Sequence, residues 1–232
     1  MCIRLLVRAG QVKSAPLEIT EIENMINHWL PQSYDFETPG GNAELKLLKL
    51  SLTSLGQENK SKENALYAIL FCNFKIKVNR SVIFNTHLNL KITAVPDYSI
   101  ENQSIGVANT ELSSIELING KDSFIKDVSN LANSVLPTPL KGLFNMAMAS
   151  STVILGEDVM SGMTRYLSIY NSGNQQKVID YHQKDIEKKI IELSQDQDLR
   201  YKLNKSNFEE KLFADFGKKI KVEDKKLNFY FV

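Results

Sequence analysis

The sequence is poor in the residues on which catalysis and metal binding usually depend. It contains three histidines, His28, His87 and His182, which fall in separate predicted elements with no cysteine or carboxylate at metal-ligand spacing. His182 lies on the apolar stripe of a predicted helix, where a hydrogen-bonded core imidazole is the more common role. There is no Gly-rich phosphate loop and no G-x-S-x-G motif. We therefore expect no catalytic residue, no metal site and no cofactor, and we expect that the protein is not an enzyme.

Neither sign of charge is in excess. Lys and Arg number 28 and Asp and Glu number 27, which gives a formal net charge of +1. This balance argues against a nucleic-acid partner and against electrostatic capture of an acidic substrate. With 43% hydrophobic and 24% charged residues over 232 positions, the composition is that of one globular domain. Partners are therefore expected to be recognised through shape or apolar surface.

Long hydrophobic runs are also missing. The most apolar segment, Leu140–Leu155, is interrupted by polar residues and is shorter than the roughly 20 residues that a membrane-spanning helix needs. Within Met1–Val12, Arg4 and Arg8 interrupt the apolar residues, so no signal-peptide core is recognisable. The protein is therefore expected to be cytoplasmic unless a leader precedes the sequence.

The two cysteines have different surroundings in the sequence. Cys72 lies in the apolar phase of a predicted strand, so we expect a buried and unreactive thiol. Cys2 lies where a bacterial lipoprotein would carry its acyl chains after its signal peptide is removed, which makes it a candidate lipid anchor.

The strongest pattern in the sequence is a pair of long alternating segments, Leu66–Val78 and Val82–Ala94. Apolar and polar residues alternate in both with a period of two, which predicts a hairpin of two strands with one apolar face and one wet face. Each strand would be about 13 residues and about 40 Å long, where ~5–6 residues are typical. Strands of this length twist and coil strongly.

A short helix is expected before this hairpin. Thr20 to Glu23 has the pattern of a capping box, and the helix should end before Pro31. It is expected to dock through one apolar face, made of Ile22, Met25, Ile26 and Trp29.

Further elements follow from the same periodicities. A slip of phase between Leu47 and Leu50 predicts a β-bulge in a strand over residues 45–52. The other expected elements are a strand over 105–117, helices over 124–135, 139–167, 178–193 and 208–216, and a terminal hairpin over 220–232.

Together these elements predict an α+β fold in which a highly coiled antiparallel sheet of long strands wraps around a long apolar helix that begins at Pro139. Additional helices in the C-terminal half and the terminal hairpin complete it. Residues 1–16 are expected to be an N-terminal extension, disordered or serving as a lipoprotein tether, and residues 17–232 a single domain. The periodicity leaves two alternatives open: the helix fills the roll, or helix and sheet leave an elongated apolar channel.

Three short motifs carry a family resemblance. They are Glu-Ile-Thr-Glu at Glu18–Glu21, Lys-Ile-Thr-Ala-Val-Pro at Lys91–Pro96, and Gly-Lys-Lys-Ile-Lys-Val at Gly217–Val222. With the order of elements, they resemble the YceB-like bacterial lipoproteins, a family of unknown function. The resemblance covers Leu17 to Val95, continues to Leu117 and returns at Gly217 to Val232. Members of that family are similar in fold to the tubular lipid-binding (TULIP) superfamily.

This resemblance implies a function and a location. It favours the channel and a lipid or other elongated apolar ligand. It also implies a periplasmic location and, as a further expectation, an anchor in the outer membrane through Cys2. From phase and size alone, the candidate lining residues are Phe74, Phe84, Leu88, Leu143, Phe144 and Met146.

A second hypothesis belongs to another class. Here the protein is a structural or interaction lipoprotein with a filled core, and its helices between Phe124 and Leu203 dock an envelope protein. This hypothesis predicts an exposed apolar patch on those helices.

Overall fold

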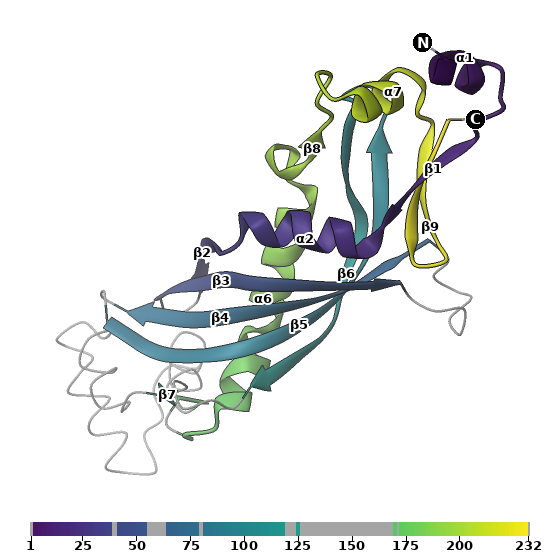
Figure 1. Ribbon diagram of the computed structural model, residues 1–232. Helices are drawn as coiled ribbons and strands as arrows, with labels where there is room; N and C mark the ends of the chain where they lie inside the picture. The colour runs from purple at the N-terminus through teal and green to yellow at the C-terminus, as the bar shows by residue number, and fades with distance from the viewer. Residues whose placement is uncertain are drawn as a thin grey trace, which may run out of the picture.

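The computed structural model describes residues 2–38, 41–54, 64–78, 81–118, 124–125, 169–170 and 172–231. In these residues the chain is α+β and forms two antiparallel sheets (Figure 1). The predicted fold class is confirmed at this level. The helices are α1 (Cys2–Arg8), α2 (Ile19–Trp29), α6 (Gln175–Gln195), the 3-10 helix η2 (Gln197–Leu199) and α7 (Phe208–Phe216). The strands are β1 (Ser14–Glu18), β2 (Gln32–Thr38), β3 (Gly41–Ser54), β4 (Leu66–Val78), β5 (Ser81–Ser99), β6 (Ser104–Ile118), β7 (Phe124–Ile125), β8 (Tyr201–Lys202), β9 (Lys219–Glu223) and β10 (Lys226–Tyr230).

The predicted hairpin is the centre of the larger sheet. The strand order is β2-β3-β4-β5-β6-β8, with β7 paired to β5. Strand β4 has the predicted bounds, whereas β5 continues to Ser99 because β6 pairs with it along its far half. Cys72 pairs with Leu88 and Leu70 with Leu90, so the apolar phases of the two strands share one face. That face carries the larger buried cluster.

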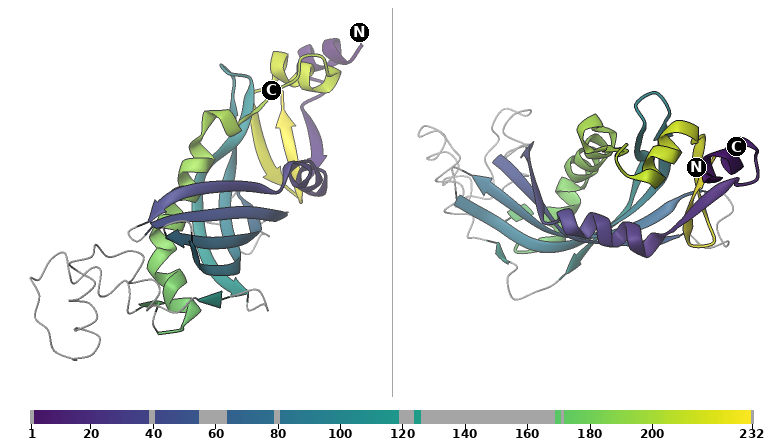
Figure 2. Two further views of the ribbon diagram at one scale, coloured as in Figure 1. Left: turned by 90° about the vertical axis from the view of Figure 1, so that its left-hand side faces the viewer. Right: turned by 45° about the horizontal axis from the view of Figure 1, so that its top comes forward.

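β-Bulges bend this sheet. The predicted bulge in β3 is confirmed, since the register with β4 shifts between Leu47 and Lys49. Two further shifts in the β5–β6 pairing, at Lys91/Ile92 and Thr93/Val95, were not predicted. Each bulge increases local twist and turns the strand. The sheet is curved, and α6 lies on its concave side (Figure 2).

Helix α6 matches its predicted pattern. The side chain of Asn174 caps it and accepts hydrogen bonds from the backbone N–H groups of Gln176 and Lys177 at 3.0 and 3.3 Å. Its buried stripe packs against the strands of the larger sheet. The buried residues of this stripe are Val178, Ile179, His182, Ile186 and Ile190.

The N-terminus of α2 differs from the prediction. Glu18 occupies the N-cap position without a side-chain hydrogen bond, so the capping box at Thr20 is wrong. The Glu23 carboxylate instead accepts a 2.7 Å hydrogen bond from the backbone N–H of Leu52. The Asn27 amide accepts from the Leu50 N–H and donates to the Leu50 carbonyl, both at 2.8 Å. Because β2 pairs with β3 only as far as Leu47, these two side chains replace a missing neighbouring strand.

This attachment leaves much of the apolar face of α2 in solvent. Ile22 is half-buried, but Met25, Ile26 and Trp29 are 50%, 39% and 72% exposed. The expected docking face is therefore wrong for these three residues. Helix α2 is attached to β3 largely through polar side chains.

The smaller sheet, β1-β10-β9, forms a second core with α1 and α7. The predicted terminal hairpin is β9–β10, and β1 pairs with β10 from Ser14↔Tyr230 to Glu18↔Lys226. Val7 of α1 is 4% exposed in this core. Residues 2–16, expected as a disordered extension or a tether, are thus in part helix and strand. Strand β1 lacks clear apolar alternation and is defined by its partner β10.

The predicted helices over 124–135 and 139–167 fall almost wholly outside the described residues. Phe124 and Ile125 form β7, in which Phe124 pairs with Asn85 and Ile125 with Phe84 of β5. A helix therefore does not begin at Phe124. The helix from Pro139, and with it Leu143, Phe144 and Met146, lies outside the described residues.

Replacing Gly217 by alanine is expected to lower the free energy of unfolding by about 1–3 kcal/mol. A Cβ at Gly217 would lie 2.5 Å from the Phe213 carbonyl oxygen and 2.6 Å from its ring. Phe213 is buried between α7 and the smaller sheet and has little room to move. Urea denaturation measures the loss, and Lys218→Ala, at the next, exposed position, should change stability by less than about 0.5 kcal/mol. Equal stabilities of the two variants would contradict the close contact.

Candidate ligand-binding interior

The three described lining candidates lie deep in the larger core. Phe74, Phe84 and Leu88 have no exposed surface. The ring of Phe74 lies 6.1 Å from that of Phe84 and 6.3 Å from that of Phe36, and the ring of Phe84 lies 6.4 Å from that of Tyr170. These side chains therefore contact core residues. The structure brings these three together; the other three candidates lie outside the described residues.

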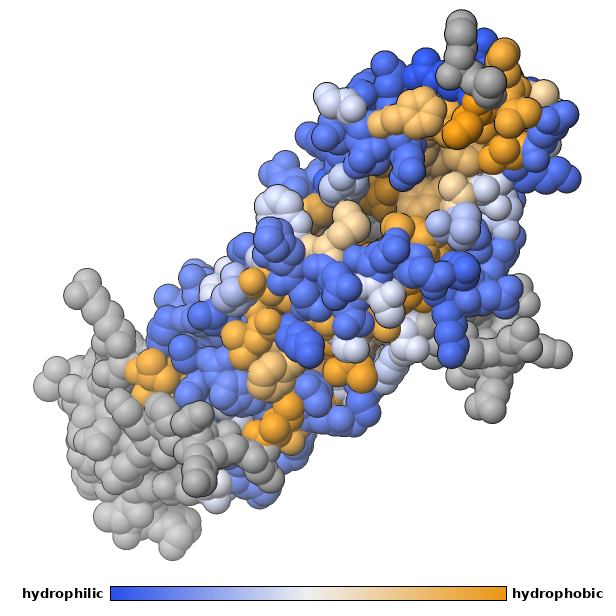
Figure 3. All heavy atoms as spheres, viewed as in Figure 1, coloured by the Kyte–Doolittle hydropathy of each residue, from blue (hydrophilic) through white to orange (hydrophobic). Residues whose placement is uncertain are grey.

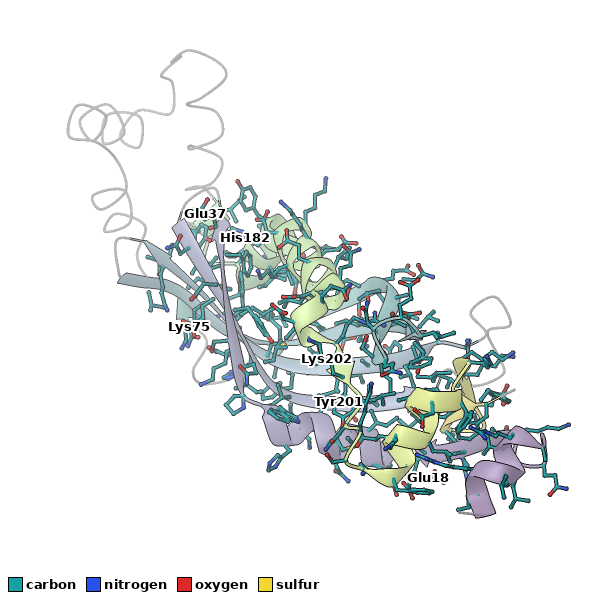
Figure 4. All side chains as sticks on the ribbon, turned by 90° about the horizontal axis from the view of Figure 1, so that it is seen from above. Glu18, Glu37, Lys75, His182, Tyr201 and Lys202 are labelled. Atoms are coloured by element: carbon teal, nitrogen blue, oxygen red, sulfur yellow. The ribbon has the colours of Figure 1, made fainter. Side chains whose placement is uncertain are left out.

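A buried polar group sits inside this apolar cluster. His182, on the half of α6 nearer its N-terminus, is fully buried, and α6 crosses the strands below it (Figure 4). Its Nε2 lies 2.9 Å from the Tyr170 hydroxyl and its Nδ1 lies 3.1 Å from Asp185 Oδ2. A carboxylate only accepts, so Nδ1–H donates to Asp185 and Nε2 accepts from Tyr170. His182 is thus a hydrogen-bonded core imidazole, the role that its position in the sequence favoured.

Burial makes this histidine sensitive to pH. Desolvation lowers the pKa of His182 below its ordinary value of 6.5, and the hydrogen bond to Asp185 only partly opposes the shift. Below pH 6.5 the unfolded chain takes up a proton at His182 that the folded chain does not take up. The contribution of His182 to the free energy of unfolding is therefore complete above this pH and decreases as the pH falls toward the lowered pKa.

We therefore expect stability to fall between neutral pH and the lowered pKa of His182, and we expect His182→Gln to remove that part of the slope. Urea denaturation at a series of pH values measures it. His87→Gln, on the polar face of β5, is the matched control and should keep the wild-type slope. If His182→Gln and the wild type lost stability in parallel, His182 would not be the group responsible.

Half-buried apolar residues extend the concave face beyond α6. Some pack against the larger cluster and others against the smaller one. In Figure 3 the surface is hollowed above α2, over the far halves of β5 and β6, and orange side chains lie in the hollow. We call these half-buried residues the inner strip: Leu47, Ala68, Leu70 and Leu117 beside the larger cluster, and Ile22, Tyr98, Ile105 and Leu203 beside the smaller one.

Arg200 attaches the segment that follows α6 to the far ends of β5 and β6, on the face opposite to Tyr98 and Ile105. Its guanidinium donates to Asp97 Oδ2 at 2.8 Å, to Ser104 Oγ at 3.0 Å and to the Ser104 carbonyl at 3.3 Å. The side chain lies flat on Gly106, where a Cβ would approach Nη1 to 2.6 Å. Strand β8 then pairs with the start of β6, and Leu203, a member of the strip, packs against the smaller cluster.

The remaining candidate groups in the described part of the chain are the two cysteines and potential metal ligands. Burial raises the pKa of the Cys72 thiol to about 12, which keeps it protonated and unreactive. Cys2 is the first residue of α1. No three His, Cys, Asp or Glu side chains among the described residues are grouped so that they could hold a metal ion. None of the helices in the described ranges is both long enough and apolar enough to cross a bilayer.

The apolar face and the buried His182 could be identified from the sequence, whereas their polar partners were not identified. His182 and Asp185 are three positions apart and share one side of a helix, a signal that could have paired them. Tyr170 and Arg200 reach their partners through tertiary packing, and no spacing in the sequence indicates those contacts. In comparisons with known proteins, no family model and no curated protein matched the chain.

Proposed function

We propose that the protein binds a lipid or another elongated apolar molecule, without catalysing a reaction, between the concave face of the larger sheet and its helices. The observation that carries the proposal is the inner strip. It joins two apolar clusters along one face of strands 13 to 19 residues long. Soluble proteins usually cover such a face, and ligand sites are mostly concave and apolar.

The chemistry of the face suits a hydrocarbon chain. In the apolar phase of β4 from Leu66 to Ile76 every residue is apolar, whereas Lys75, Lys77 and Lys91 project from the other face. Each methylene of a ligand that is transferred from water to an apolar face contributes about 0.8 kcal/mol to binding. The entropy lost when the ligand is ordered opposes this gain. A long chain would therefore be held by length and shape, with little contribution from charge.

The finer architecture and the location form part of the same proposal. In it the coiled sheet wraps around a long helix, as in the tubular lipid-binding proteins. The protein belongs to the bacterial envelope as a periplasmic lipoprotein anchored through Cys2. The resemblance at Glu18–Glu21, Lys91–Pro96 and Gly217–Val222 supports this part, and the curvature of the sheet is consistent with it.

Titration with dansyl-undecanoic acid tests the proposal. The fluorescence of the dansyl group should rise and shift to the blue as it leaves water, and an excess of palmitate should reverse the change. Urea-unfolded protein is the control, because it keeps the composition and loses the face. A folded protein that produced no fluorescence change with this probe would contradict the proposal.

The exposed side of α2 favours a second candidate, docking of an envelope protein. On this reading Met25, Ile26 and Trp29 form the contact, and not the helices between Phe124 and Leu203. Trp29 is the chain's single tryptophan, so its emission reports directly on this surface. Binding of a purified partner should shift that emission to the blue, and Met25→Asp should weaken the shift. Unchanged emission in a proven complex would exclude α2 as the contact.

A further inference from the structure

A short helix at one end of the molecule exposes apolar side chains beside two cations, Arg8 and Lys218. Helix α1 is held against α7 by the buried Val7, by an Arg4–Asp215 ion pair at 3.4 Å, and by Arg8, which lies 5.4 Å from the centre of the Phe216 ring. These contacts use one side of α1. The other side carries Ile3, Leu5 and Leu6, which are 47%, 61% and 38% exposed, and orange side chains gather at this end in Figure 3.

A recess of about 400 Å³ lies where the C-terminal ends of α1 and α7 meet. Arg8 and Lys218 line it together with Phe216 and Phe231. Within the part of the chain that the structure describes, neither cation forms an ion pair with a carboxylate. Asp215 also lines the recess, and Arg4 compensates its charge. The recess therefore presents an excess of positive charge directly beside the exposed side of α1.

We propose that this end of the molecule docks on a lipid bilayer that carries anionic headgroups. Ile3, Leu5 and Leu6 enter the interface, while Arg8 and Lys218 face lipid phosphates. An apolar helix side flanked by arginine and lysine is the arrangement that lies in the plane of such a surface.

The charge at this end favours a bilayer over a second copy of the chain. The whole chain has a net charge of +1, yet residues 2–13 contain Arg4, Arg8 and Lys13 and no Asp or Glu. A two-fold dimer through this surface would bring the same cations together, whereas anionic headgroups complement them. This docking does not depend on whether the interior holds a ligand, and its test is separate from that of the proposed function.

Vesicle flotation with the full chain tests the docking. The protein should float with vesicles of equimolar phosphatidylcholine and phosphatidylglycerol, bind pure phosphatidylcholine vesicles about tenfold less tightly or worse, and dissociate in high salt. Leu5→Asp should weaken binding about tenfold, and Arg8→Gln or Lys218→Gln about fivefold each, which is the effect of about 1 kcal/mol per cation. Leu5→Gln gives a second variant if Leu5→Asp unfolds.

Met25→Asp is the matched control, because Met25 is also an exposed apolar residue on a helix of the same protein, 50% exposed against 61% for Leu5. It should bind vesicles like the wild type. Equal binding to both kinds of vesicle, or an equal loss in Met25→Asp and Leu5→Asp, would overturn the proposal. Release of the protein by millimolar inorganic phosphate at constant ionic strength would overturn it too, since the recess would then be a site for the free anion.

Discussion

Phe84→Ala is expected to lower the free energy of unfolding by about 3–5 kcal/mol. Phe84 has no exposed surface and its ring contacts those of Phe74 and Tyr170, so truncation leaves a cavity that the long strands around it cannot close. Urea denaturation measures the change. The matched control is Phe208→Ala on α7, where the ring is 49% exposed and the loss should be below about 1 kcal/mol.

The size of this loss also distinguishes a packed core from a ligand channel at Phe84. A residue that lines open space contributes little to stability and much to ligand binding. A loss below about 1 kcal/mol for Phe84→Ala would therefore contradict the packing described here and return Phe84 to the lining of a channel.

Leu70→Glu is expected to weaken uptake of dansyl-undecanoic acid by more than about tenfold, because it places a charge in the inner strip that the ligand's chain would have to desolvate. Leu70 pairs with Leu50 and Leu90 on the concave face. The measurement is the fluorescence titration, made at a temperature at which circular dichroism shows the variant folded.

The adjacent position gives the control for this experiment. Ile69 pairs with Ser51 and Lys91 on the opposite face of the same strand, so Ile69→Glu adds the same charge outside the strip. It should keep wild-type uptake. Equal losses in the two variants would mean that the ligand does not lie on the concave face.

The β4–β5 hairpin of the larger sheet could be predicted from the sequence because these two strands alternate apolar and polar residues and share one buried face. The bounds of β4 and the bulge near Leu47 followed from that alternation alone. The two bulges between β5 and β6 could not be predicted in the same way. There the apolar phase of β6 is irregular, and its register is set by pairing with β5.

Helix α2 shows where periodicity fails. Its apolar side was expected to dock, but the edge of β3 that faces away from β4 has no strand partner beyond Leu47, and unpaired N–H and C=O groups are costly to bury. Asn27 and Glu23 satisfy those groups, which turns Met25 and Trp29 toward solvent. The unpaired edge of β3 is a consequence of the tertiary structure, so no local sequence pattern could indicate the orientation of α2.

The sequence predicts which face of the larger sheet carries the candidate site, but it identifies only some of the residues of that site. Phase selected Phe74, Phe84 and Leu88 correctly as inward-facing. Phase does not indicate which inward-facing residues other elements cover. These three lie in one buried cluster with Tyr170 and residues of α6, while Leu70 and Ile105 remain half-buried. Which inward-facing residues stay accessible depends on the path of α6 and on where the hydrogen bonds of Arg200 attach the segment that follows it. Neither follows from strand periodicity.

Native mass spectrometry of the gently purified full chain tests the central claim most directly. We expect a population heavier than the polypeptide by the mass of a lipid-sized apolar molecule. Extraction with organic solvent, followed by refolding, should remove the extra mass and increase uptake of dansyl-undecanoic acid. A protein that carries only its polypeptide mass, and that takes up no dansyl-undecanoic acid before or after extraction, would contradict the account.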